Sequence, residues 1–194
     1  MDAPILTGRQ VCLEPLEERH REGLRVAADD ERIWVNTLVN ARGPVFDRWF
    51  DDSLANRAAG RQVPFAVRRL SDGALVGSTS YLDPVAHHRR VEIGSTWYVP
   101  AEWGTAINPE CKLLLLAHAF EVLGMNRVSF CTDLRNTHSQ AAIEKLGAVK
   151  EGILRSHMIT QGERIRDTVS YSIIRVEWPE VKQRLIERTV PQLP

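Results

Sequence analysis

A glycine-containing loop that leads into a helix start gives the first chemical signal in this chain. The run Trp103-Gly104-Thr105-Ala106-Ile107-Asn108 follows a strand pattern that stops at Pro100. The first backbone N–H groups of a helix have no partner within the helix, and that end carries a partial positive charge. Gly104 lets a ligand approach the main chain closely, and Thr105 and Ala106 are small. These features predict an anion site, although they also fit an ordinary strand-to-helix connection.

Glu92 is the candidate for proton transfer. It belongs to the strand pattern Arg90–Val99, where strict alternation would place it on the face of Tyr98 and opposite Ile93 and Trp97. A carboxylate in a partly dry groove has a raised pKa, which suits a general base. The alternative is a surface glutamate that pairs with a neighbouring arginine.

A second helix start carries an amide and a hydroxyl. Asn136 fits an N-cap, and the helical pattern after it ends at Gly147. Ser139 lies in the first turn of this helix. The chain has no Gly-x-Ser-x-Gly pattern, so Ser139 is not expected to be a hydrolase nucleophile. Asn136 is therefore placed to cap this helix.

Charge and cysteine usage exclude several function classes. Lysine plus arginine and aspartate plus glutamate number 25 each, which argues against a nucleic-acid partner. The three cysteines, Cys12, Cys111 and Cys131, are far apart and form no CxxC pair. We therefore expect free thiols, and neither a disulfide framework nor a zinc site. The histidines also lack ligand-type spacing, so no metal is expected.

Length and hydropathy predict a single domain, residues 1–194, in the cytoplasm. Apolar residues make up 43% of the 194 residues, enough for a sizeable core. The most apolar stretch, Leu113–Ala117, is far shorter than the ~20 residues that span a bilayer. Met1–Gln10 lacks the basic and apolar segments of a secretory signal, so neither export nor a membrane partner is expected.

The elements that position these residues follow from two periodicities. Alternating patterns at Val63–Leu70 and Ala74–Leu82 flank the turn Ser71-Asp72-Gly73, and a third strand follows at Arg90–Val99. Three consecutive strands of this kind predict an antiparallel meander. The remaining predicted strands are Gln10–Leu16, Arg127–Thr132 and a hairpin of Val149–Thr160 with Arg164–Arg175.

Helices are predicted between these strands. Asn108-Pro109-Glu110 is a strong helix start, with Asn108 as the cap, and this helix ends at Gly124. A strand, this helix and the strand Arg127–Thr132 form a crossover, which implies one parallel strand pair in a mostly antiparallel sheet. Ligands of such sheets bind where adjacent strands diverge. The other predicted helices are Glu17–Ala28, Pro44–Ala59, the helix from Asn136 and the helix from Trp178 to Arg188.

Several segments match a known family in their order. They are Glu92-Ile93-Gly94, the stretches Trp103–Lys112 and Arg135–Ala148, and the later stretches Glu151–Arg155 and Arg166–Ser172. Together they resemble the GNAT acyltransferase superfamily, in particular the branch of ribosomal-protein-alanine N-acetyltransferases. The resemblance covers nearly the whole chain. It departs from the superfamily at Ala101, where a glutamine or arginine is usual.

The resemblance implies the fold and the acetyl donor. It implies a mixed α/β (α+β) GNAT-like sheet, mostly antiparallel, with one splayed parallel strand pair and helices on both faces. The cosubstrate would be acetyl-CoA, whose pantetheine arm would bond to the main chain of Trp97, Tyr98 and Val99. Lys112 would either lend charge to a phosphate or be solvated. The pyrophosphate would lie on Trp103, Gly104, Thr105, Ala106, Ile107 and Asn108, and Asn136 would reach the coenzyme from the next helix.

The resemblance also implies roles in catalysis. An amine attacks a thioester only in its neutral form, so a base is useful, and Glu92 would act directly or through water. Many relatives protonate the leaving thiolate with a tyrosine, but Ile143 stands at that position here. Ser139 would replace it, as in the ribosomal-protein branch. No activated cysteine is evident, so direct attack in a ternary complex is expected.

The acceptor and the assembly stay open at this point. The acceptor is a protein N-terminal amine or a small molecule such as an amino acid or an antibiotic, and Trp34, Asn36 and Arg42 lie in the segment that would cover it. Other readings are an acyl-CoA-binding module without catalysis and a nucleotide-binding α/β domain. A monomer and a homodimer through the last hairpin or helix are both compatible with the sequence.

Overall fold

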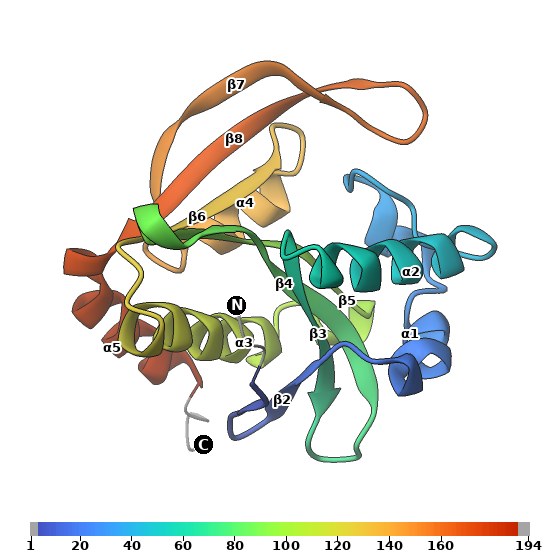
Figure 1. The fold of residues 1–194 in the computed structure, drawn as a ribbon, viewed down its shortest axis with the longest axis horizontal. Coiled ribbons are helices and arrows are strands. Elements are labelled where there is room, and N and C mark those ends of the chain that lie inside the picture. Colours follow the sequence, from blue (N-terminus) through green and yellow to red (C-terminus); the bar gives the residue numbers. More distant parts are fainter. Residues whose placement is uncertain (1–3, 190–194) are drawn as a thin grey trace.

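One mixed sheet runs through residues 4–189, the part of the chain that the computed structural model describes (Figure 1). Its eight strands lie in the order β1-β2-β3-β4-β5-β6-β8-β7 within these residues. Neighbouring strands are antiparallel except β5 and β6, which confirms the predicted sheet. The strands are β1 Leu6–Thr7, β2 Val11–Pro15, β3 Gln62–Arg69, β4 Leu75–Val85, β5 Arg90–Tyr98, β6 Arg127–Asp133, β7 Val149–Ile159 and β8 Ile165–Ile174.

The helices cover both faces of this sheet, as expected. None of those between residues 4 and 189 combines the length and apolar character of a membrane span. The predicted element order is confirmed, and the two-residue strand β1, too short to show a periodicity, is additional. Residues 1–3 and 190–194 of the predicted domain lie outside the described residues. The helices are α1 Arg21–Ala27, α2 Val45–Ala58, α3 Ile107–Ala117, α4 Thr137–Glu144 and α5 Trp178–Thr189.

Two hydrophobic cores hold the helices to the sheet. On one face, Cys111 and Leu115 of α3 and Leu185 of α5 pack against the strands. On the other face, Leu24 of α1 and Phe50 of α2 form a smaller core. All five side chains are fully buried, which explains why their helices were readable from apolar spacing.

The parallel pair β5–β6 separates after a short contact. Its register runs only through Arg90–Arg127, Val91–Val128 and Glu92–Ser129. Strand β5 continues to Tyr98 beside β4, while β6 continues to Asp133 beside β8. The sheet therefore opens into a gap between the second halves of β5 and β6, as the splayed pair in the prediction required.

A β-bulge in β5 changes which face its later residues occupy. Ser78 pairs with Trp97 but Ser80 pairs with Gly94, so one residue of β4 faces two of β5. Ser95 sits in the bulge with a φ of +46°. The extra residue moves Tyr98 into the α3-side core and Trp97 into the α1–α2 core. The predicted alternation, with Tyr98 on the face of Glu92 and Trp97 opposite, is therefore wrong beyond the bulge.

The hairpin of β7 and β8 arches away from the main sheet toward the segment before α2 (Figure 1). At its tip the N–H of Gln161 donates to the carbonyl of Leu38 at 2.9 Å. The Oε1 of Gln161 accepts the N–H of Asn40 at 2.5 Å. Two loops far apart in the sequence thus meet at the tip of the hairpin.

Candidate functional site

The main chain of Tyr98 faces the gap. The N–H of Val99 donates to the carbonyl of Val76 at 2.9 Å, and Trp97 lies opposite Ser78 in the same register. In an antiparallel ladder alternate residues bond to the partner strand, so the groups of Tyr98 point the other way. Of the three residues predicted to offer main-chain bonds, Trp97, Tyr98 and Val99, the structure leaves Tyr98 free of β4.

The indole of Trp103 reaches across to the same place. Its Nε1 donates to the carbonyl oxygen of Tyr98 at 3.1 Å. The ring lies 6.3 Å from that of His138, which belongs to α4 beyond the gap, and Trp103 is 43% exposed. An extended ligand in the gap would therefore meet this indole and compete with it for the Tyr98 carbonyl.

The turn before α3 presents unpaired N–H groups. In the described part of the chain, the N–H groups of Gly104, Ala106 and Asn108 have no protein acceptor. Gly104 has a φ of +78°, and a Cβ placed there would meet nothing within 4 Å. These three donors and the amino-terminal end of an eleven-residue helix make an open anion cradle.

Side chains fix the shape of this turn. Buried Glu102 forms an ion pair with Arg69, and its Oε2 accepts the Thr105 hydroxyl at 3.2 Å. The same Oγ1 accepts the N–H of Ile107 at 3.3 Å, so Thr105 serves the first turn of α3. Asn108 was predicted to cap the helix, and that was wrong, because α3 begins one residue before it.

Lys112 is neither solvated nor placed on the open cradle. Its Nζ is buried and donates to the hydroxyls of Thr79 and Thr96 at 3.3 and 2.8 Å. Those hydroxyls also bond to each other at 2.8 Å, directly beside the bulge at Ser95. Burial lowers the pKa of Lys112 to about 8. Lys112 therefore links α3 to the bulge in β5 through these hydrogen bonds.

The start of α4 has the predicted cap. The Oδ1 of Asn136 accepts the N–H of Ser139 at 3.0 Å. Ser139 itself is half-buried, and Ile143, at the position where many relatives have tyrosine, is in the core. The amide nitrogen of Asn136 makes no hydrogen bond within residues 4–189, so capping leaves it free for a ligand.

Glu92 lies where β5 and β6 part. Burial raises its pKa, the neighbouring Asp83 charge raises it further, and the Cys131 thiol, Arg166 and His157 oppose the rise. The predicted direction of this shift is confirmed. A carboxylate with a raised pKa takes up a proton more readily at neutral pH, as a general base must.

The cysteines offer no nucleophile. Burial, followed by the charge of Glu92, raises the pKa of Cys131 to about 12, so its thiolate is scarce at neutral pH. Cys131 itself is half-buried on the internal strand β6. Cys12 and Cys111 are buried and free, and no cluster of three or more metal-ligating side chains occurs between residues 4 and 189.

The three residues expected to cover the acceptor are separated in the structure. Trp34 is buried against Trp97, at 5.4 Å between ring centroids, and its Nε1 donates to the Ala28 carbonyl. Asn36 is half-buried in the following segment. Arg42 is exposed and its Nε bonds to Asp29 at 2.9 Å. Trp34 thus packs against Trp97 of β5, whereas Asn36 and Arg42 lie in the segment between α1 and α2.

Sequence reasoning missed a polar wall beside Glu92. Arg166 and Thr168 are two residues apart on β8, so they share one face of the strand, and Arg164 directly precedes the strand at the same spacing. Asp133 of β6 lies opposite Thr168 in the register and pairs with Arg164. The alternation of polar residues was visible in the sequence, but it is equally typical of a solvated face.

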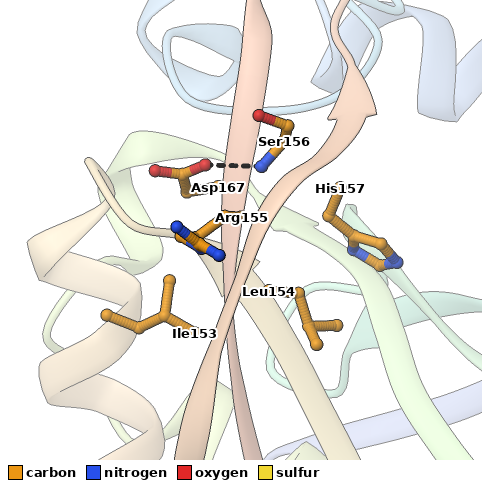
Figure 2. Close-up of a pocket in the computed structure, with 6 residues that line it drawn as sticks. All are labelled: Ile153, Leu154, Arg155, Ser156, His157 and Asp167. Carbon is orange, nitrogen blue, oxygen red and sulfur yellow. Dashed lines mark hydrogen bonds between the residues drawn. The ribbon is translucent and has the colours of Figure 1, made fainter.

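The β7–β8 hairpin opens near this wall into a shallow depression of about 810 Å³. Ser156 has a φ of +51°, and its N–H donates to Oδ1 of Asp167 at 2.7 Å. Figure 2 shows Ile153 and Arg155 on one side of β7, and Leu154 and His157 on the other. His157 is close enough for its charge to lower the pKa of Glu92.

Comparison with known proteins identifies one family. The family model described as acetyltransferase (GNAT) domain matches residues 10–149, which is more than half of the chain. The protein YdaF of Bacillus subtilis (strain 168), named as a ribosomal N-acetyltransferase, is 34% identical over 109 residues. That stretch covers 56% of this chain and 58% of YdaF, so the match spans little more than half of that relative.

Solved structures agree in fold. A GCN5-related N-acetyltransferase from Brucella melitensis has a TM-score of 0.88 at 28% identity, covering 98% of this chain and 87% of that one. RimJ of Mycobacterium smegmatis, solved in complex with CoA-disulfide, has a TM-score of 0.77 at 22% identity. The RimJ comparison covers 91% of this chain and 88% of RimJ, and at that identity it shows the fold alone.

Proposed function

The chain belongs to the GNAT acetyltransferase family, and on that premise we propose that it transfers the acetyl group of acetyl-CoA to a primary amine. The family uses acetyl-CoA as donor. One observation carries the proposal: β5 and β6 stop pairing after Glu92 and Ser129, which leaves a gap beside unpaired main-chain groups. A fully paired sheet would have no place for the pantetheine arm.

The residues around the gap fit such a donor. The N–H and C=O of Tyr98 would pair with the amides of the pantetheine arm, once the Trp103 indole yields the carbonyl. The N–H groups of Gly104, Ala106 and Asn108 would hold the pyrophosphate, and the start of α3 adds its partial positive charge. The amide nitrogen of Asn136 would reach the coenzyme from α4.

Proton transfer would be divided between two residues. The amine nitrogen would attack the thioester carbon and form the amide bond as the carbon–sulfur bond breaks. Glu92, directly or through water, would take the proton from the amine. The hydroxyl of Ser139 would supply a proton to the departing thiolate, because Ile143 has none to give.

For the acceptor we propose a protein N-terminal α-amine. Its pKa of about 7.7–8.0 leaves more of it neutral near pH 7 than a lysine side chain, so a modest base is enough. The name of YdaF, a ribosomal N-acetyltransferase, supports this choice. A small-molecule amine is the alternative. An acyl-CoA-binding module without catalysis is the outcome to exclude first, since the family's frequent tyrosine is absent.

Release of free coenzyme A thiol tests the activity. The purified protein is mixed with acetyl-CoA and a panel of N-terminal peptides, amino acids and small amines. We expect thiol release with at least one amine, and a large loss in Glu92→Gln and Ser139→Ala. Tight acetyl-CoA binding without release from any amine would indicate a binding module. Thermal stabilisation by ATP or NAD rather than acetyl-CoA would contradict the proposed donor.

A further inference from the structure

Arg166 is a buried guanidinium without a partner. The residue is 6% exposed, and its Nε is buried with no hydrogen-bond acceptor. Within residues 4–189 no carboxylate lies within the 4.0 Å of an ion pair. Burial of an unpaired charge is costly, and burial also lowers the pKa of Arg166. A buried guanidinium of this kind is suited to bind an oxygen atom of a ligand.

The carboxylate whose charge acts most strongly on Arg166, that of Asp133, is already occupied. Buried Asp133 forms its ion pair with Arg164, which directly precedes β8 and lies two residues before Arg166. Its other oxygen, Oδ1, accepts the N–H of Arg135 at 2.9 Å. One carboxylate thus serves the outer arginine and the backbone, and the inner arginine is left without an anion.

A second orphan group lies beside the first. Thr168 is fully buried, and its Oγ1 has no hydrogen-bond partner in the described part of the chain. It follows Arg166 by two residues, so both side chains project from the same face of β8. A guanidinium N–H and a hydroxyl, both donors, therefore converge on one region of the wall.

This region belongs to the same space as the proposed base. Cys131 neighbours Glu92, and Ser170 and Thr168 lie opposite Cys131 and Asp133 in the β6–β8 register. The charges of Arg166 and Glu92 act on each other across the gap. A ligand that brings its amine to Glu92 therefore has its neighbouring atoms near Arg166.

Building on the proposed acetyl transfer, we infer that Arg166 and Thr168 form a subsite for the acceptor. This subsite binds an oxygen of the acceptor, on the carbon atom next to the carbon that bears the amine. That oxygen is the carbonyl of a peptide's first residue or the carboxylate of a free amino acid. A polyamine or a lysine side chain has no such oxygen, and the additional positive charge of a polyamine would be repelled by Arg166. The subsite thus selects α-amino acyl acceptors.

Product inhibition of the unmodified protein tests the subsite first. N-acetylalanine amide and N-isopropylacetamide differ by a carboxamide in place of a methyl group, and neither contains an ionisable amine. A hydrogen bond to a charged group predicts that the first compound inhibits at a concentration at least about tenfold lower. Equal inhibition by the two compounds would overturn the inference.

Substitution of Arg166 tests the residue itself. In Arg166→Met, kcat/KM for alanine amide should fall about 10- to 100-fold, whereas that for isopropylamine should change by less than about twofold. Arg166→Lys retains the charge and should recover part of the loss. Arg127→Met is the matched control, because it removes an arginine of β6 from the same face of the sheet, where Arg127 pairs with Glu151. Equal losses for both amines in Arg166→Met would show a structural role only.

The amine panel separates this inference from the proposed function. Preference for alanine would point to a free amino acid, and preference for an alanyl peptide amide to a protein N-terminus; either supports the subsite. Preference for butane-1,4-diamine over both would overturn it. If no amine releases coenzyme A thiol, the proposed function fails. If isopropylamine and alanine amide react equally well, only the subsite fails.

Discussion

Glu92 shows how its surroundings prepare a carboxylate for proton transfer. Burial at the point where β5 leaves β6 raises its pKa, while the charges of Arg166 and His157 limit the rise. A base acts in its deprotonated form, so kcat/KM should increase with pH as Glu92 loses its proton. This rising part of the pH profile, its acid limb, should lie above the ordinary glutamate pKa of 4.5.

Replacing this carboxylate should remove that limb. In Glu92→Gln we expect kcat/KM for the amine to fall about 100-fold or more, since positioned bases contribute 10²–10⁴-fold. The increase in rate that comes from deprotonation of the acceptor's own ammonium group should persist. The measurement is a profile of initial rates between pH 4.5 and pH 9. An unchanged rate with an unchanged acid limb would show that Glu92 is not the base.

Single residues were predictable where local chemistry decides their role. The Asn136 cap follows from its position before a helical pattern, and the structure has its hydrogen bond. Arg166 and Lys112 were not predictable, because their burial depends on elements distant in sequence that pack over them. In the sequence both are ordinary charged residues, one on a hairpin strand and the other on a helix.

At the scale of elements, the bulge in β5 is the feature that alternation could not predict. Its existence depends on the register with β4, which is a non-local property. Gly94 and Ser95 were the available signals, since glycine within a strand often marks a bulge. The helices and strands themselves could be predicted, because the spacing of apolar residues that indicates them is a local feature of the sequence. The start of α3 was misplaced because Thr105, rather than Asn108, serves its first turn.

Lys112 beneath this bulge leads to a stability prediction. Its folded-state pKa of about 8 is below the usual 10.5, so the folded protein holds this proton less tightly than the unfolded chain. Stability is therefore reduced below pH 8 and recovers as pH rises toward 10.5. Lys112→Met removes that cost and leaves the Thr79–Thr96 hydrogen bond in place. At pH 7 we expect a free energy of unfolding higher by ~2 kcal/mol.

Urea unfolding at pH 7 and at pH 10 checks this prediction. The gain in Lys112→Met should be large at pH 7 and should shrink at pH 10, where the lysine of the folded protein is already neutral. An equal loss of stability at both pH values would mean that the packing and hydrogen bonds of Lys112 outweigh its desolvation. Leu113→Met, a neighbouring and partly buried apolar position, is a control for the introduced side chain.

Across the whole molecule, a charge network joins the first strands. Glu14 of β2 accepts hydrogen bonds from Arg68 of β3 and contacts His20 at 2.8 Å. The Arg68 hydrogen bond is the largest of the effects that lower the pKa of Glu14 to about 2. A lowered pKa contributes stability above about pH 4.5, and this contribution is lost as pH falls from 4.5 toward 2.

Glu14→Gln should therefore destabilise the protein in a pH-dependent way. At pH 7 the loss should be on the order of 3 kcal/mol, because each pKa unit corresponds to about 1.36 kcal/mol. Near pH 2 the difference from the unmodified protein should shrink, because the pH then reaches the folded-state pKa of Glu14 and most of the charge contribution is lost. Urea unfolding at the two pH values measures both quantities. The same loss at pH 2 as at pH 7 would indicate packing rather than charge.

The gap between β5 and β6 was predictable at this scale only through the family resemblance. The order of strands and helices implied one parallel pair, but the number of residues that remain paired is set by the bulge and by the strands on either side. The meeting of Gln161 with Leu38 and Asn40 was not predictable, because loops carry no periodic signal.

Hydrogen exchange of single backbone amides, measured with and without acetyl-CoA, tests the central claim most directly. If the pantetheine arm lies between β5 and β6, the amides of Tyr98, Gly104, Ala106 and Asn108 should exchange at least about tenfold more slowly when acetyl-CoA is bound. The Val99 amide, already bonded to Val76, should change little. Binding that leaves these four amides unchanged and protects others instead would contradict the account.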